Sequence, residues 1–353
     1  MYKSKFIFAS IIISFIIFMS FIAGCKNDTV LPTSPSSNEV TYNAVYVVNG
    51  GSNSISVIDI STDSLRQTIS LPSVNWPHHI NMNNTKTKIA LGVPGMDLSV
   101  GHGGHNMIMD GKVLVLDAIT GAVLNSRVTR NMNHNSIFSP DGTEIWTAIA
   151  DSIGVIFVYN SSTLAFKDSI IVGMHPSEVT FSSDGSMAFV ANTGSSTVTV
   201  INPLNKSVMS TIPVGEDPVG AWTGSNNKMF VDNEMSQTVS VIDVASMNVE
   251  ETISLGFKPG YVAYNGALNE VWVTNETDGT AVYFQRMGGV WMNHGNISTG
   301  SGAHAIVFSN DGAKAYITNQ TAGTVSVINT SSKIKVKDIN VGVKPNGLLI
   351  RYN

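Results

Sequence analysis

The chain has 353 residues, of which 43% are apolar and only 13% are charged, so an intrinsically disordered protein is excluded. Lys and Arg total 20 against 25 Asp and Glu, and no basic run follows the N-terminal segment. Nucleic acid is therefore not expected as a partner, because binding to phosphates requires clustered basic side chains. The single cysteine excludes a disulfide framework and a cysteine-based zinc finger.

Residues 1–24 are predicted to be a signal peptide. Two lysines precede an apolar run over residues 6–22, and small residues follow it, as is typical of secretory signals. A membrane-anchor helix is the alternative for an apolar run of this length. The ending Ile22-Ala-Gly-Cys25 resembles the bacterial lipobox, in which the chain is cleaved before a cysteine that is then diacylated. The resemblance implies a lipid anchor on Cys25 in the bacterial cell envelope, on the periplasmic face or the cell surface.

Residues 25–40 are predicted to be a flexible tether between the lipid and a folded domain. The segment is rich in Ser, Thr, Pro and Asn and cannot form a core. The remainder, residues 41–353, is predicted to be a single domain.

This domain repeats one pattern seven times. Short runs of alternating residues, mostly ending in Asn, recur about every 41 to 44 residues where they are adjacent. The seven runs occupy residues 46–49, 88–91, 145–148, 189–192, 230–233, 272–275 and 316–319. A second alternating run follows each of them, and Asp-Gly turns at 141–142, 184–185 and 311–312 join adjacent strands.

Four short strands per repeat predict an all-β fold, a seven-bladed β-propeller with four-stranded blades. Residues 345–352 match the innermost-strand pattern, whereas residues 41–71 lack such a strand. We therefore expect the C-terminal strand to join the N-terminal blade and to close the ring.

The runs Val271-Trp-Val-Thr-Asn275 and Ala315-Tyr-Ile-Thr-Asn319, with Gly-Thr-Val-Ser-Val-Ile after the second, resemble the YVTN family of propeller repeats. The resemblance covers residues 41–353 and implies the fold. It does not imply one activity, because propellers include enzymes, binding proteins and scaffolds.

Seven of the eight histidines fall on one face of the expected disc, called here the top face. This face carries the loops that enter the innermost strands and the loops between second and third strands. Matching Met82, Phe138, Phe181 and Phe308 as one repeat position places three histidines and Ser177 at equivalent sites at the channel mouth. The seven top-face residues are His78, His79, His134, His175 and His304 before or at innermost strands, and His102 and His105 in an insertion over residues 94–111.

These seven histidines are the predicted metal ligands. Met132 and Met174 stand near His134 and His175, and imidazole with thioether suits copper in an oxidising compartment. Imidazole with a carboxylate such as Asp97 or Asp110 suits zinc, so the prediction is copper before zinc. The alternative is that the histidines are structural and bond neighbouring blades, as in the WD40 repeat.

No catalytic residues are predicted, because serine-hydrolase, zinc-protease and phosphate-loop motifs are absent from the sequence. The segment Pro77-His-His-Ile80 resembles the histidine-bearing hub of nitrous oxide reductase, a copper enzyme, over part of the ring. We predict a monomeric, lipid-anchored propeller that binds a ligand on its top face through this metal site. Two alternatives remain: a metal-free scaffold for a protein or glycan partner, and a copper-dependent oxidoreductase.

Overall fold

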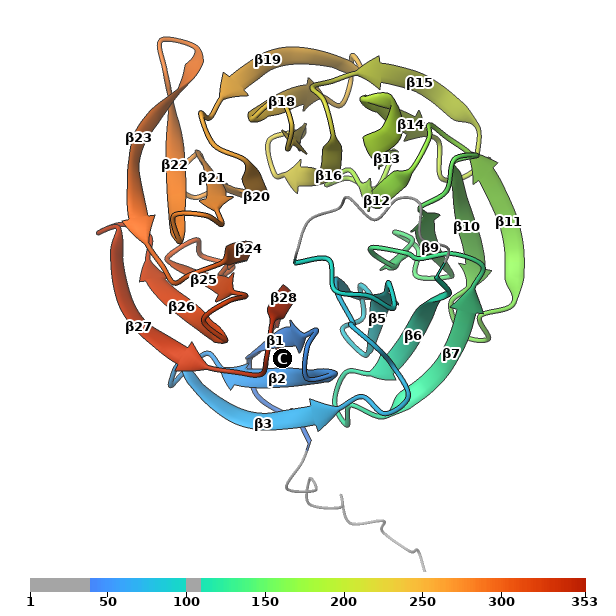
Figure 1. Ribbon diagram of the computed structural model, residues 1–353, viewed down its shortest axis with the longest axis horizontal. Coiled ribbons are helices and arrows are strands. Elements are labelled where there is room, and N and C mark those ends of the chain that lie inside the picture. The colour runs from blue at the N-terminus through green and yellow to red at the C-terminus, as the bar shows by residue number, and fades with distance from the viewer. Residues whose placement is uncertain (1–38, 100–108) are drawn as a thin grey trace, which may run out of the picture. The chain divides into compact units, whose positions relative to one another are not determined.

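The computed structural model describes residues 39–99 and 109–353. Seven four-stranded antiparallel sheets are arranged around a central axis, so the predicted seven-bladed β-propeller is confirmed (Figure 1). Within each sheet the strand order runs from the axis to the rim. The part of the chain that the structure describes contains no helix long and apolar enough to cross a membrane.

The first three blades contain the chain ends and the shortest innermost strands. Blade 1 consists of β28 (Pro345–Arg351), β1 (Ala44–Asn49), β2 (Ser54–Asp59) and β3 (Ser64–Ser70). Blade 2 consists of β4 (Ile80–Met82), β5 (Lys88–Val93), β6 (Gly111–Asp117) and β7 (Val123–Thr129). Blade 3 consists of β8 (Ile137–Phe138), β9 (Glu144–Ile149), β10 (Val155–Asn160) and β11 (Phe166–Ile171).

The other four blades have innermost strands of six or seven residues. Blade 4 consists of β12 (Pro176–Phe181), β13 (Ala188–Asn192), the 3-10 turn η1 (Thr193–Ser195), β14 (Thr197–Ile201) and β15 (Val208–Pro213). Blade 5 consists of β16 (Pro218–Gly224), β17 (Lys228–Asn233), β18 (Thr238–Asp243) and β19 (Asn248–Ser254). Blade 6 consists of β20 (Pro259–Asn265), β21 (Glu270–Asn275), β22 (Thr280–Met287) and β23 (Val290–Ser298). Blade 7 consists of β24 (Ala303–Phe308), β25 (Lys314–Asn319), β26 (Thr324–Asn329) and β27 (Ile334–Asn340).

The ring closes as the sequence predicts, because β28 pairs antiparallel with β1 and places Ala44 opposite Arg351. The Arg351 guanidinium donates a hydrogen bond of 3.0 Å to the carbonyl of Val40. Val40 is fully buried in the core between blades 1 and 2, so the packed domain includes this residue just before the predicted start at 41. Closure pairs a strand edge of β1 that would otherwise invite association with another chain.

The core lies between the blades, because each sheet packs both faces against its neighbours. Trp146 on β9 and Trp272 on β21 are fully buried. Each contacts a phenylalanine at the end of the next blade's innermost strand, with ring centroids 5.4 Å apart for Phe181 and 5.3 Å for Phe308. Both tryptophans therefore pack between adjacent blades.

The recurring asparagine at the end of the second strand shapes the following top-face turn. Its side-chain amide donates hydrogen bonds of 2.9 to 3.1 Å to the hydroxyls five and seven residues later. The four asparagines with this contact are Asn49, Asn192, Asn233 and Asn319. The turn is thereby held in one shape in four blades.

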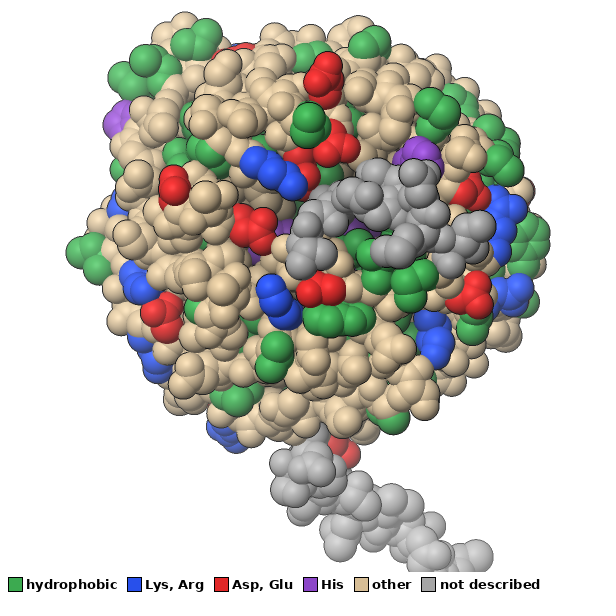
Figure 2. All heavy atoms as spheres, viewed as in Figure 1, with side chains coloured by type: hydrophobic (Ala, Val, Ile, Leu, Met, Phe, Trp, Pro, Cys, Tyr) green, Lys and Arg blue, Asp and Glu red, His purple; other side chains and the backbone are tan. Residues whose placement is uncertain are grey.

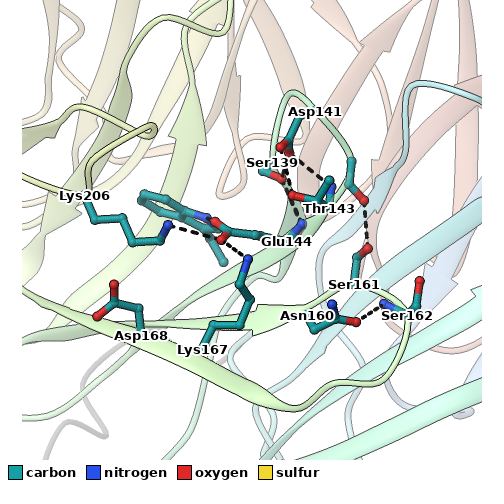
Figure 3. A network of polar contacts seen from close by, with 12 residues as sticks. Ser139, Asp141, Thr143, Glu144, Asn160, Ser161, Ser162, Lys167, Asp168 and Lys206 are labelled. Atoms are coloured by element: carbon teal, nitrogen blue, oxygen red, sulfur yellow. Dashed lines mark hydrogen bonds and ion pairs between the residues drawn. The ribbon is translucent and has the colours of Figure 1, made fainter.

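Charged contacts link blades on the opposite face. Glu144 on β9 accepts a hydrogen bond from the Trp146 indole at 3.0 Å and pairs with Lys206 of blade 4 at 3.1 Å (Figure 3). The same arrangement occurs between blades 6 and 7, where Lys333 lies 2.6 Å from Glu270.

The closing junction reverses the charges of this contact. Lys314 on β25 of blade 7 contacts Asp63 in the β2–β3 turn of blade 1 at 2.6 Å. The Tyr316 hydroxyl donates to the same carboxylate at 2.5 Å, so the aromatic and the charge stand at the same strand positions as in the other two contacts.

Candidate metal centre

Four of the seven predicted histidines converge at the top end of the central channel. His78 and His79 directly precede β4, His134 lies three residues before β8, and His304 lies within β24. The ring centroid of His78 lies 4.3 Å from that of His134 and 4.4 Å from that of His79. The His304 ring is 5.8 Å from the His78 ring. All four residues are buried, with 2 to 8% of their surface exposed. His78, His134 and His304 share one repeat position, so we expected them to lie together at the channel mouth.

The two consecutive histidines meet because the backbone around them is irregular. In a regular strand the side chains of adjacent residues point to opposite faces. β4 begins only at Ile80, and its preceding residues bond instead to Gly92, with the His78 N–H donating to the Gly92 carbonyl at 2.9 Å. A Cβ on Gly92 would lie 2.8 Å from the Asn135 Cα, so glycine allows this close approach of blades 2 and 3. The irregular segment brings both imidazoles to one place.

The three histidines His78, His79 and His134 form a potential metal-binding group. One ring nitrogen from each lies within 4.8 Å of the other two. Tetrahedral ligands at about 2.0–2.1 Å from a zinc ion are about 3.4 Å apart, so the separations between the nitrogens must shrink by up to about 1.4 Å. Side-chain rotation of imidazoles can supply such a movement, and the donor set therefore fits a metal.

Glu178 on β12 joins two members of this group. Its Oε1 lies 2.5 Å from His134 Nδ1 and 3.1 Å from His79 Nε2, and its side chain is 1% exposed. A carboxylate on the second ring nitrogen fixes the tautomer and orientation of a metal-binding histidine. Glu178 was not among the residues predicted for this site. The available signal was an ionisable residue directly after Ser177, inside an innermost strand.

His175 is not brought to this group. It is half-buried on the loop before β12, has a φ of 48°, and its ring lies against Gly194. The position two residues before the repeat's channel-mouth site also has positive φ in four other blades, at Trp76, Asp217, Gly302 and Lys344. These residues have the same backbone conformation, but their side chains are of different chemical types. The position is therefore defined by its backbone conformation and not by a metal ligand. His102 and His105 lie outside the described residues, and His294 lies on the outermost strand β23.

Met132 and Met174, the two methionines considered above as thioether ligands, lie in other surroundings. Met132 packs in an apolar cluster with Leu98 and Ala150, and the Met174 side chain is 47% exposed. Asp97 and Asp110 do not belong to the group either. The potential ligand atoms are imidazole nitrogens, which suit zinc and copper alike. The preference for copper therefore receives no support from Met132 or Met174.

A cavity of about 530 Å³ extends from this centre toward the opposite face of the disc. His79, Glu178, Trp222 and Tyr261 line it, as do residues of the Asp-Gly turns of blades 3 and 4 and of the matching turn of blade 2. We expected a ligand on the top face, whereas this cavity lies between the histidines and the turn face.

The channel wall at blade 5 contains a buried carboxyl group. Asp232 on β17 accepts hydrogen bonds from the Trp222 indole at 2.7 Å and from the Gly220 N–H at 3.1 Å. Burial, reinforced by the negative charges of Glu234 and Glu178, raises the pKa of Asp232 well above its ordinary value. Burial also raises the pKa of the Tyr261 phenol. In Figure 2 acidic and basic side chains both lie around the centre of the disc, with histidine visible between them.

The fold and this centre define a seven-bladed β-propeller with histidines gathered at one end of its channel. No protein-family model matches the sequence, so the resemblance to the YVTN family stays a prediction. No curated protein matches it in sequence either.

Solved structures share the fold. A periplasmic gluconolactonase of Pseudomonas aeruginosa superposes with a TM-score of 0.72 at 18% identity, over 87% of this chain and 98% of that one. A putative 6-phosphogluconolactonase of Bacteroides fragilis gives 0.70 at 15% identity, over 90% and 100%. The dihydro-heme d1 dehydrogenase NirN gives 0.64 at 14% identity, over 90% and 77%. At these identities the likeness shows the fold alone.

Proposed function

We propose that this chain is a metal-binding propeller of the bacterial cell envelope, in which His78, His79 and His134 hold zinc or copper at the top end of the channel. One observation carries the proposal. Three buried imidazoles offer nitrogens within 4.8 Å of one another, and a buried carboxylate, Glu178, bonds two of them.

Physical chemistry supports a metal over a purely structural role for this group. Buried polar groups are costly unless their hydrogen bonds are satisfied, and a structural histidine needs only one or two partners. In metal sites the histidine ligands are oriented by hydrogen bonds to carboxylates. Three histidines in one place, two of them bonded to one carboxylate, have this arrangement. A zinc ion on three histidines keeps a fourth position for water or substrate and acts there as a Lewis acid.

The envelope location rests on the N-terminal segment. Residues 1–24 have the pattern of a signal peptide, and Cys25 follows a lipobox-like sequence, although both lie outside the described residues. A structural neighbour described as periplasmic agrees with this location. We propose that lipid on Cys25 anchors the chain at the membrane.

Metal content tests the proposal directly. The full chain, purified without a histidine tag, is analysed for copper, zinc and iron by elemental mass spectrometry, before and after incubation with each metal. We expect about one metal per chain in the wild type, loss of it in the double variant His78→Ala with His134→Ala, and retention in the control His294→Ala. A wild-type protein that takes up neither zinc nor copper contradicts the proposal.

A second candidate is hydrolysis of a sugar lactone without a metal. His79 and Glu178 are 3.1 Å apart and both line the cavity, where such a pair could activate water as a general base. Structural neighbours described as a gluconolactonase and a putative 6-phosphogluconolactonase motivate the substrate class. Acid release from D-glucono-1,5-lactone by chelator-treated protein, abolished in Glu178→Gln, would support it. No rate above the spontaneous one would remove it.

A further inference from the structure

The cavity next to the metal centre has the size of a small-molecule site. Its volume of about 530 Å³ lies within the usual range for ligand pockets. Of the three candidate metal ligands only His79 lines it, and the rest of its wall comes from innermost strands and from the turns that follow them. The metal centre therefore gives a role to one end of the cavity only. Apart from Glu178, the residues of the remaining wall have no role in the metal site.

The wall offers amide and hydroxyl groups that the protein does not use. The Asn81 Oδ1 accepts the Phe138 N–H at 3.1 Å, while its Nδ2 has no hydrogen bond to any residue that the structure describes. Within residues 39–99 and 109–353, the Thr180 and Tyr261 hydroxyls likewise form none. These donors and acceptors can bond a ligand rich in hydroxyl groups.

The charge of the wall selects against anions. Glu178 and Asp184 line the cavity, and the described lining residues include no Lys or Arg. Hydrogen bonds from the Ser182 hydroxyl and from Ser186 lower the pKa of Asp184 to about 2, so this carboxylate is ionised at neutral pH. A phosphorylated or carboxylated ligand would meet like charge without a cationic partner, which costs affinity.

Two aromatic rings provide an apolar surface in the same wall. The ring centroids of Trp222 and Tyr261 are 3.9 Å apart with an interplanar angle of 34°. The hydrogen bond from the Trp222 indole to Asp232 fixes the orientation of this ring. A fixed aromatic surface beside polar groups suits a ring-shaped molecule that has an apolar face and polar edges.

We propose that this cavity binds an uncharged, polyhydroxylated molecule of monosaccharide size, which bonds Asn81, Thr180 and Tyr261 and packs against Trp222. The molecule reaches the cavity from the face of the Asp-Gly turns, where Asn84, Pro140 and Asp184 line it. The site does not require the metal, so it goes beyond the metal-binding function proposed above. It deepens the second candidate, because a sugar lactone belongs to the same chemical class, and binding of the probes is measured separately from lactone hydrolysis.

Isothermal titration of the full chain tests the site. The probes are D-glucose, D-galactose and myo-inositol, each compared with its monophosphate ester. We expect at least one neutral probe to bind and its ester to bind at least tenfold more weakly. Tyr261→Phe and Thr180→Val, which remove hydroxyls that form no bond within the described protein, should each weaken binding by about three- to tenfold. Tyr283→Phe on β22 is the matched control and should have no effect.

His134→Ala separates this site from the metal centre, because His134 is not among the lining residues. This variant should lose the metal and retain the sugar, so failure of either proposal can be distinguished from failure of the other. The cavity proposal is overturned if no neutral probe binds at tens of millimolar, if an ester binds as tightly as its parent, or if Tyr261→Phe and Thr180→Val both leave the affinity unchanged. Loss of sugar together with metal in His134→Ala would also overturn it.

Discussion

Glu178 Oε1 and His134 Nδ1 lie 2.5 Å apart, and both side chains are buried. An ionised carboxylate can only accept, so Nδ1–H donates and Nε2 becomes the nitrogen that can bind a metal. The carboxylate and the imidazole come from adjacent blades, β12 and the segment before β8. The orientation of the ring therefore depends on how these two blades pack.

Glu178→Gln should weaken zinc or copper binding by about 10- to 100-fold, because a neutral amide orients the two imidazoles less firmly and does not raise their basicity. Competition with a chelator of known affinity measures the change. Glu216→Gln, at an exposed position, is the control and should bind as the wild type does. Equal affinities for Glu178→Gln and the wild type would show that the carboxylate does not support the metal.

Asp232→Asn should stabilise the protein at neutral pH. The folded state raises the pKa of this carboxyl, so wild-type stability falls as pH rises above the ordinary value of 3.8, where the unfolded chain ionises. The amide stays neutral and can still accept both hydrogen bonds. We expect a higher free energy of unfolding than that of the wild type at pH 7, and no difference near pH 3. Denaturant unfolding at several pH values measures it.

Asp184→Asn should change the stability in the opposite direction at pH 7 and serves as the comparison. The folded state lowers the pKa of this carboxyl to about 2, chiefly through the Ser182 hydroxyl. Its contribution is present above pH 3.8 and is lost as pH falls through about 2. The substitution should therefore destabilise at pH 7 and have little effect near pH 2. The same sign for both variants would contradict the assigned shifts.

Lys333→Ala should destabilise the ring by about 2–4 kcal/mol, because it leaves the Glu270 carboxylate buried without its cation. Lys333 Nζ lies 2.6 Å from Glu270, whose side chain is 2% exposed. Lys337→Ala is the matched control. Lys337 is exposed on β27 and forms no ion pair with any residue that the structure describes, so its loss should cost less than about 1 kcal/mol. Urea unfolding compares the two variants, and equal effects would show that the blade 6–7 contact adds nothing to stability.

Deletion of residues 345–353 should abolish the soluble monomer. It removes β28, which exposes the edge of β1 and opens the core between blades 7 and 1. Size-exclusion chromatography and soluble yield measure the outcome. Deletion of residue 353 alone removes only exposed hydrogen bonds to Thr41 and Asn43 and should be tolerated. A monomeric, cooperatively unfolding protein without β28 would show that closure is dispensable.

The repeat pattern alone predicts the blades, their number and the closing strand. Strand alternation has a period of two and each blade is one repeat, so local patterns define each sheet and β28 is recognised by its likeness to other innermost strands. The same alignment placed His78, His134 and His304 at equivalent positions near the innermost strands. In a closed ring all such positions lie close to the central axis.

Which of these residues meet depends on the three-dimensional packing of the blades. His79 joins His78 because the chain before β4 is irregular, and a regular strand would have separated them. Glu178 of blade 4 meets His134 of blade 3 and His79 of blade 2, and Trp222 meets Tyr261 through packing of blades 5 and 6. A repeat specifies which positions are alike. Distances across the channel depend on how the blades pack together, and that packing is set by contacts between residues far apart in the chain.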